Sequence, residues 1–270
     1  MIQINIEEII KTKSAKLHRL LPRFVIRYLR HILHEDEIND ILIRYHGQDG
    51  VSFANGVMEE FQIRFNVHHQ ENIPTEGRFI VASNHPLGGF DGLALITLIS
   101  NYHRNIKFPV NDFLMHLPNM QDIFVPVNKT GRNSVAMAYH FDEIFRSDNV
   151  ILYFPAGICS RKIAGKIQDM EWKKTFVSKA KAFHRDILPV YFSGRNSEFF
   201  YRLANLRRKL RLKTNLEMAF LADELFKQRH SLYDVYIGKP ISYKSLTGEK
   251  SDYQWAQEIR NHVYQLRMEN

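Results

Sequence analysis

Residues 79–99 read FIVASNHPLGGFDGLALITLI. The first four residues predict a buried strand and the last seven a buried helix, with a short polar loop between them. His85 and Asp91 stand in this loop on either side of the pair Gly88-Gly89. Chemistry in α/β proteins gathers where strands end, and a histidine held by a carboxylate is a usual general base near neutral pH. A plain helix-entry turn capped by Asp91 is the alternative interpretation.

The composition of the whole chain is that of a globular protein. The chain has 270 residues, of which 44% are hydrophobic and 12% aromatic, and its net charge of +8 favours anionic partners such as nucleic acid, anionic lipid or a phosphorylated ligand. The single cysteine, Cys159, excludes an internal disulfide and leaves either a nucleophile or an inert buried thiol. We see no apolar run of the roughly 20 residues that span a bilayer, and no secretory signal.

From residue 76 onward, short apolar runs alternate with helical periods. This alternation predicts an α/β fold with a largely parallel central sheet flanked by helices. The expected strands are 78–83, 106–110, 123–128, 149–154, 187–192 and 235–238. The expected helices include 133–146, 172–184, 197–211, 216–228 and 253–268.

Residues 1–75 are expected to form a helical N-terminal extension. Apolar residues recur with helical spacing from Leu17 to Leu33, and Pro22 either kinks one helix or begins a second. Cations lie among them, and no acid occurs between residues 9 and 34. A basic amphipathic helix is typical of membrane-surface binding, so we interpret residues 1–75 as a membrane-associating segment. An ordinary helix with a solvated face is the alternative.

A second loop, residues 153–162, reads YFPAGICSRK and also follows an apolar run. In a parallel sheet it would end at the same edge as the His85 loop. Arg161 has the planar donor geometry that grips a carboxylate or phosphate, Lys162 adds a point charge, and backbone N–H groups around Gly157 are candidates for stabilising an oxyanion. Taken alone, the segment is also compatible with a tight turn and solvated charges.

The pairing of the two loops resembles the lysophospholipid (glycerolipid) acyltransferases. Their His-x-x-x-x-Asp block corresponds to His85 and Asp91, and their Phe-Pro-Glu-Gly-x-x-Ser block to residues 154–160. Leu188-Pro189-Val190 resembles the fourth block, and residues 123–125 loosely match the second, with Lys129 where its cation is expected. The resemblance covers about residues 76–240, and we assign residues 76–270 to the acyltransferase domain.

Two departures from the family pattern are visible. Five residues, not four, separate His85 from Asp91, and Ala156 stands in place of the usual Glu. The variant Phe-Pro-Ala-Gly-x-x-Ser-Arg resembles the hemolysin-like branch, which acylates aminolipids. The expected acceptor is therefore a lyso-aminolipid of the glycine or ornithine type, with lysophosphatidic acid as the alternative.

The resemblance implies transfer of a fatty acyl group from a thioester, acyl-ACP or acyl-CoA, to a hydroxyl, without a metal, a resident cofactor or an acyl-enzyme. His85 would take the hydroxyl proton and Asp91 would orient the ring. The implied substrate-binding residues are Asn84, Lys129, Phe154, Pro155, Gly157, Ser160, Arg161 and Lys162. We expect a peripheral protein on the cytoplasmic side of the inner membrane, attached to an anionic membrane surface.

Three other functions were weighed against acyl transfer. A thioesterase or lipase-like hydrolase would use the same His–Asp pair to activate water. A nucleic-acid-binding protein would explain the basic clusters, but neither loop, and we expect no nucleic-acid partner. A catalytically silent lipid-binding scaffold is suggested by Ala156 and by the longer His–Asp spacing.

Overall fold

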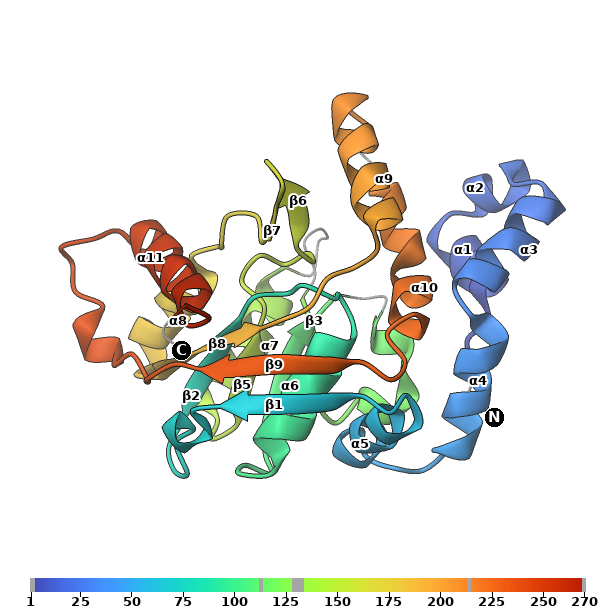
Figure 1. The fold of residues 1–270 in the computed structure, drawn as a ribbon. Helices are drawn as coiled ribbons and strands as arrows, with labels where there is room; N and C mark the ends of the chain where they lie inside the picture. The colour runs from blue at the N-terminus through green and yellow to red at the C-terminus, as the bar shows by residue number, and fades with distance from the viewer. Residues whose placement is uncertain (1–2, 112–113, 128–133, 213–214, 269–270) are drawn as a thin grey trace.

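A seven-stranded sheet runs through the computed structural model, which describes residues 3–111, 114–127, 134–212 and 215–268 (Figure 1). The strand order is β1-β9-β8-β2-β5-β3-β4. Strands β8, β2, β5, β3 and β4 are parallel, β9 runs antiparallel to β8, and β1 runs parallel to β9. The strands are β1 (Arg64–His68), β2 (Phe79–Ser83), β3 (Ile106–Val110), β4 (Phe124–Pro126), β5 (Val150–Tyr153), β8 (Asp186–Phe192) and β9 (Leu232–Ile237). The expected largely parallel sheet is confirmed.

Helices cover both faces of the sheet and form the N-terminal extension. The N-terminal helices are α1 (Ile6–Lys13), α2 (Ala15–Leu20), α3 (Arg23–Ile32), α4 (Glu35–Arg44) and α5 (Gly50–Glu60). The later ones are α6 (Phe90–Ser100), α7 (Ser134–Arg146), α8 (Thr175–Phe183), α9 (Glu198–Lys209), α10 (Leu221–Phe226) and α11 (Asp252–Gln265). Short 3₁₀ turns are η1 (Gln70–Asn72), η2 (Leu114–His116), η3 (Pro118–Met120), η4 (Leu216–Phe220) and η5 (Tyr243–Ser245).

Strand β2 lies at the centre of the sheet and is buried along its whole length. Because side chains alternate along a strand, Phe79 and Val81 enter the core on the α5–α6 face. Ile80 and Ala82 enter the core on the opposite face, which α8 and α11 cover. Burial on both faces explains why this strand is continuously apolar and not alternating. It also fixes the end of β2, and with it the loop that begins at Asn84.

The N-terminal extension is mostly helical, as expected, but it also contains strand β1. Pro22 precedes α3, so it begins a new helix and does not kink a single one. Strand β1 pairs with β9, and α5 buries Phe53 and Val57 in the core that includes α6. The boundary expected at residue 76 therefore does not coincide with the edge of the sheet. The sequence of β1, RFNVH, did not predict a strand because only two of its five residues are apolar.

Helices α2 and α3 present apolar side chains to the outside. Leu20 and Phe24 have 69% and 72% of their surface exposed, and Leu17 and Tyr28 are about half exposed. Only Ile26 and Ile32 of α3 are buried. In the described ranges no helix combines the length and the apolar character that a membrane crossing needs.

A separate two-stranded sheet, a hairpin that the sequence did not predict, follows the second loop. Strands β6 (Arg161–Ile163) and β7 (Lys166–Gln168) pair antiparallel around a two-residue turn. Both turn residues, Ala164 and Gly165, have positive φ, as the tight turns of hairpins with right-handed twist require. Alanine at the first position is not a usual signal for such a turn, so this hairpin escaped the sequence analysis.

Candidate active site

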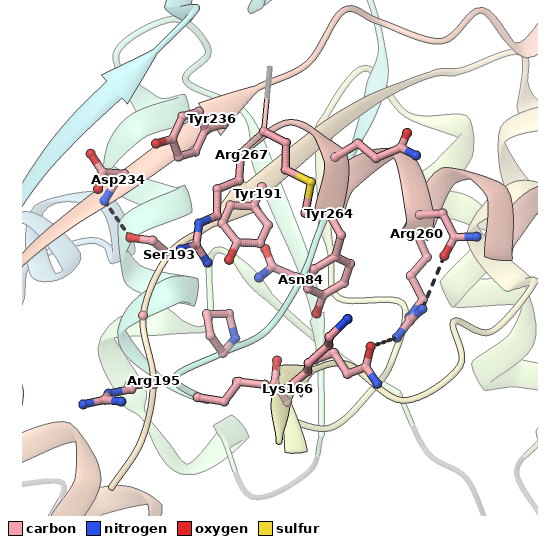
Figure 2. Close-up of a pocket in the computed structure, with 18 of the residues that line it drawn as sticks. Asn84, Lys166, Tyr191, Ser193, Arg195, Asp234, Tyr236, Arg260, Tyr264 and Arg267 are labelled. Carbon is pink, nitrogen blue, oxygen red and sulfur yellow. Dashed lines mark hydrogen bonds between the residues drawn. The ribbon is translucent and has the colours of Figure 1, made fainter. Parts of the chain in front are cut away.

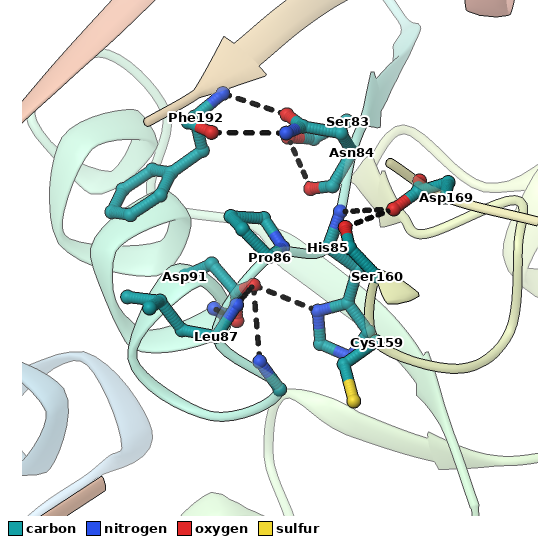
Figure 3. A network of polar contacts seen from close by, with 12 residues as sticks. Ser83, Asn84, His85, Pro86, Leu87, Asp91, Cys159, Ser160, Asp169 and Phe192 are labelled. Atoms are coloured by element: carbon teal, nitrogen blue, oxygen red, sulfur yellow. Dashed lines mark hydrogen bonds and ion pairs between the residues drawn. The ribbon is translucent and has the colours of Figure 1, made fainter. Parts of the chain in front are cut away.

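The loop that follows β2 brings His85 and Asp91 into contact. His85 Nδ1 lies 2.9 Å from Asp91 Oδ2 (Figure 3). A carboxylate only accepts hydrogen bonds, so the neutral ring carries its proton on Nδ1 and keeps the lone pair of Nε2. Asp91 is fully buried, whereas 16% of the His85 side chain is exposed. The pair therefore has the arrangement of a general base oriented by a carboxylate.

The same carboxylate shapes the loop. Asp91 Oδ2 also accepts hydrogen bonds from the backbone N–H groups of Leu87 (2.9 Å) and Gly88 (3.2 Å), and Oδ1 accepts one from Gly92 (3.0 Å). The five residues between His85 and Asp91 thus wrap around one buried carboxylate, which accommodates the longer spacing. The N-cap of α6 is Gly89, so the interpretation of Asp91 as the helix cap is wrong.

Close approach of α10 explains the glycine pair. Gly88 has a φ of +81°, and a Cβ there would lie 2.9 Å from the side chain of Leu221, the first residue of α10. A Cβ on Gly89 would lie 2.8 Å from Leu225. Larger residues would push α10 away from the loop, so the glycines let this helix cover the His85 side of the site.

Phe154, from the second loop, forms one wall of the histidine. Its ring stacks on the His85 imidazole with 3.9 Å between centroids and an interplanar angle of 18°. Its own position is supported by an edge contact with Phe108. The two loops therefore meet, as expected, and the imidazole is held by a carboxylate at one nitrogen and by an aromatic face.

Asn84 and Ser160 lie beside His85 but are engaged in the framework. The Asn84 side chain exchanges two hydrogen bonds with the backbone of Phe192, tying the end of β2 to the end of β8 (Figure 3). The Ser160 backbone N–H donates to the His85 carbonyl oxygen at 2.7 Å, and its hydroxyl donates to Asp169. Both side chains are buried, so they hold the loops together.

Asp169, which the sequence analysis did not single out, links these loops to the C-terminal helix. Its carboxylate accepts hydrogen bonds from Ser160 Oγ (2.6 Å), the His85 backbone N–H (3.2 Å) and Trp172 Nε1 (2.9 Å). Burial raises the pKa of this carboxyl, and the three donors act in the opposite direction. No local pattern marks this residue, because it follows β7 and reaches His85 only through the tertiary fold.

The remaining residues of the second loop form a tight turn. The Gly157 backbone N–H donates to the Phe154 carbonyl at 3.0 Å, and the Pro155 carbonyl accepts from the backbone of Lys173. Gly157 has a φ of +69°. The N–H of Gly157 is therefore used inside the turn, and the expectation that it stabilises an oxyanion is not supported by this geometry.

The Arg161 guanidinium contacts other protein groups and not an open pocket. It is buried, and its guanidinium donates to Glu217 Oε1 (2.8 Å), to the Cys159 carbonyl (2.7 Å) and to Cys159 Sγ (3.0 Å). Glu217 also pairs with Arg207 of α9 at 3.0 Å. Because its donors face protein atoms, Arg161 joins the β6–β7 hairpin to η4 and α9, and the expected anion clamp is wrong for this geometry.

The expected cation Lys162 is also engaged within the protein. Lys162 pairs with Glu198 at 2.8 Å on an exposed part of α9. Lys129 lies outside the described residues. Cys159 is buried, and burial raises the pKa of its thiol to about 11, so it is an inert thiol and not a nucleophile.

A pocket of about 910 Å³ lies next to the His85 loop, although His85 itself is not among its lining residues (Figure 2). Asn84 and Pro86, the two neighbours of His85 in the chain, line it together with Ser160. The remaining lining residues come from the hairpin, the ends of β8 and β9, and α11. They are Gly165, Lys166, Ile167, Gln168, Tyr191, Ser193, Gly194, Arg195, Asp234, Tyr236, Arg260, Asn261, Tyr264, Gln265, Arg267 and Met268.

Comparisons with known proteins show the family of this chain. A family model described as Acyltransferase matches residues 8–269. The chain is 44% identical over 264 residues to a lyso-glycine lipid O-acyltransferase of Phocaeicola vulgatus, covering 97% of this chain and 95% of that protein. It is 43% identical over 264 residues to a protein of the same name from Bacteroides thetaiotaomicron, covering 97% of each.

A solved structure was also found among similar folds. The 1-acyl-sn-glycerophosphate (LPA) acyltransferase PlsC from Thermotoga maritima superimposes with a TM-score of 0.48 and 18% identity. The superposition covers 90% of this chain and 92% of that one.

Proposed function

Because this chain belongs to the acyltransferase family, we propose that it moves a fatty acyl group from a thioester to the hydroxyl of a lyso-glycine lipid. Both relatives, which match this chain along nearly its whole length, are named for O-acyl transfer to a lyso-lipid. The thioester donor, the glycine head group and the role of each residue are the proposal.

The observation that carries the proposed mechanism is the contact between His85 and Asp91. His85 Nε2 removes the proton of the acceptor hydroxyl while the oxygen attacks the thioester carbonyl, forming a C–O bond. The tetrahedral intermediate then collapses, the C–S bond breaks, and the leaving thiolate takes the proton back from Nε2. General base assistance of this kind is worth about 10²–10⁴-fold in rate.

Direct attack fits the other side chains near the histidine. Cys159 is buried and remains a thiol at neutral pH, while the Ser160 hydroxyl donates to Asp169. Neither is presented to a substrate as a nucleophile, so the mechanism needs no acyl-enzyme intermediate.

We propose that α2 and α3 place the enzyme on its lipid substrate. Their exposed apolar residues Leu17, Leu20, Phe24 and Tyr28 lie among the cations Lys16, Arg19, Arg23 and Arg27. An apolar face between cations suits the interface of an anionic membrane. Helix α9, with the basic run Arg207-Arg208-Lys209, projects at the same end of the molecule in Figure 1.

The experiment that tests the proposed function supplies purified protein with an acyl thioester and with lyso-glycine lipid, lyso-ornithine lipid or lysophosphatidic acid. We expect the diacylated glycine lipid to form fastest, and expect His85→Ala to lower that rate by about 10³-fold. The control His46→Ala removes an exposed histidine and should leave the rate unchanged.

Two outcomes would contradict the proposal. Release of free fatty acid at the same rate with or without the lyso-lipid would assign a hydrolase. Near wild-type transfer by His85→Ala, with the fold checked by circular dichroism, would exclude His85 as the base.

A further inference from the structure

The pocket lined by Asn84 and Pro86 has a strong excess of positive charge. Lys166, Arg195, Arg260 and Arg267 line it, and Asp234 is its one carboxylate among the residues described. In Figure 2, Arg195 and Arg260 lie at opposite ends of the pocket, with Tyr191 and Tyr264 between them. Cations collected in one concave site repel one another, and an anion relieves that repulsion.

Close ion pairs do not neutralise these cations within the described part of the chain, where Arg267 and Arg195 interact only at longer range with the carboxylates of Asp234 and Glu198. No hydrogen bond or ion pair engages the side chains of Lys166, Arg195 or Arg267 there. Arg260 donates to neutral oxygens, the Asp169 carbonyl at 2.6 Å and Gln168 Oε1 at 3.4 Å, and its buried Nε has no partner. Asp234 is itself held by His68 and Asn66.

The polar groups of the pocket suit a head group that contains an amide as well as an anion. The Tyr191 and Tyr236 side chains line the pocket, and no hydrogen bond in the described ranges engages either hydroxyl. Each can donate to an amide carbonyl or accept from an amide N–H. The volume, about 910 Å³, lies in the range of sites for small ligands.

We propose that this pocket binds the carboxylate of the acceptor's amino-acid head group, with Arg267 and Lys166 as principal cations. This inference rests on the proposed function. The pocket takes the anion-binding role first expected of Arg161, because the Arg161 guanidinium is paired with Glu217 inside the fold. In a lyso-aminolipid the anion and the reacting hydroxyl are only a few bonds apart, and both chain neighbours of His85 line the pocket, so a head group bound there lies against the loop that carries the proposed base. The phosphate of a thioester carrier sits at the end of a long arm.

The test compares Arg267→Ala and Lys166→Ala with wild type on lyso-glycine lipid and on its uncharged methyl ester. Loss of a charged hydrogen bond should raise the KM for the carboxylate lipid about 10- to 100-fold. The KM for the thioester and the rate with the methyl ester should stay unchanged. Lys239→Ala is the matched control, because it removes one exposed lysine that is not among the lining residues of the pocket.

Direct binding separates this inference from the proposed function. N-acylglycine and its methyl ester are titrated into the His85→Ala protein, with and without Arg267→Ala. Preference for the carboxylate, lost in the double variant, supports the pocket whether or not wild type transfers acyl groups to this lipid. Equal binding of both ligands, or a raised KM for the thioester in place of the lipid, would overturn the inference.

Discussion

At the scale of single residues, Asp91 does two things at once. It orients His85 at 2.9 Å and gathers three backbone N–H groups of its own loop. An isolated helix-entry turn would need only the second role. The combination explains how one carboxylate both sets the tautomer of the base and holds a loop one residue longer than usual for the resembled family.

Asp91→Asn should therefore impair both roles. The amide NH₂ would face hydrogen-bond donors, so we expect a loss of about 10²–10⁴-fold in kcat and a destabilisation of about 1–3 kcal/mol from unsatisfied groups. Steady-state kinetics and urea unfolding measure the two effects separately. Unchanged kcat in a fully folded variant would remove Asp91 from the mechanism.

Cys159→Ala should leave kcat within about threefold of wild type, because buried thiols of raised pKa are inert. Native protein should likewise resist iodoacetamide at pH 8, and unfolded protein should not. Mass spectrometry of quenched reactions reads both the alkylation and any acyl-enzyme. An acylated Cys159 peptide would contradict direct transfer.

At the scale of elements, the β6–β7 hairpin is anchored by charge. Arg161 of β6 and Arg207 of α9 both contact Glu217, which is fully buried. A buried carboxylate between two guanidinium groups joins β6 to α9 and η4, two elements that lie much later in the chain. It explains why a residue placed in the second loop serves the packing of α9 and η4.

Arg161→Ala should destabilise the fold by about 3 kcal/mol, because Glu217 loses a buried partner. The double variant Arg161→Met/Glu217→Leu should recover much of this loss. Wild type, Arg161→Met, Glu217→Leu and the double variant form a complete cycle, which chemical denaturation measures. A variant Arg161→Ala of wild-type stability, with a raised KM for one substrate alone, would restore the anion-clamp interpretation.

Helices α2 and α3 make the second prediction at this scale. Phe24→Glu puts a charge on the most exposed aromatic of α3, and we expect liposome binding to weaken about tenfold from lost apolar insertion. Tyr253→Glu, on the exposed face of distant α11, is the matched control. Sedimentation with anionic vesicles measures both. Equal partitioning of the two variants would assign α2–α3 to another role.

At the scale of the whole molecule, the sheet draws in residues from both ends of the chain. Strand β1 pairs with β9, and α5 fills the core beside α6. A chain that begins at residue 76 should thus fail to fold, since it exposes β9 and the core around Phe53 and Phe61. A chain that begins at residue 35 should remain folded. Thermal unfolding of the two truncated proteins measures this, and cooperative unfolding of the shorter chain would contradict it.

The local sequence pattern was sufficient to predict an element wherever most of its residues are buried. The central strand β2 and helix α6 are continuously apolar because both are buried, and the loop between them pairs His85 with Asp91 as the spacing suggested. Strand β1 and the β6–β7 hairpin were not predicted, because β1 is largely polar and the hairpin lacks the usual turn residues. Their pairing is decided by partners elsewhere in the chain.

The amino-acid sequence by itself determined the α/β class, the two loops and the pairing of His85 with Asp91, since hydrophobic period and motif order are local properties. Only the tertiary structure decided which cations remain available. Arg161 pairs with Glu217, 56 residues away in the chain, whereas Arg267 and Lys166 line one pocket together with Asn84 and Pro86. The reason is physical: the charge that a side chain offers to a ligand depends on its burial and on partners that the fold supplies.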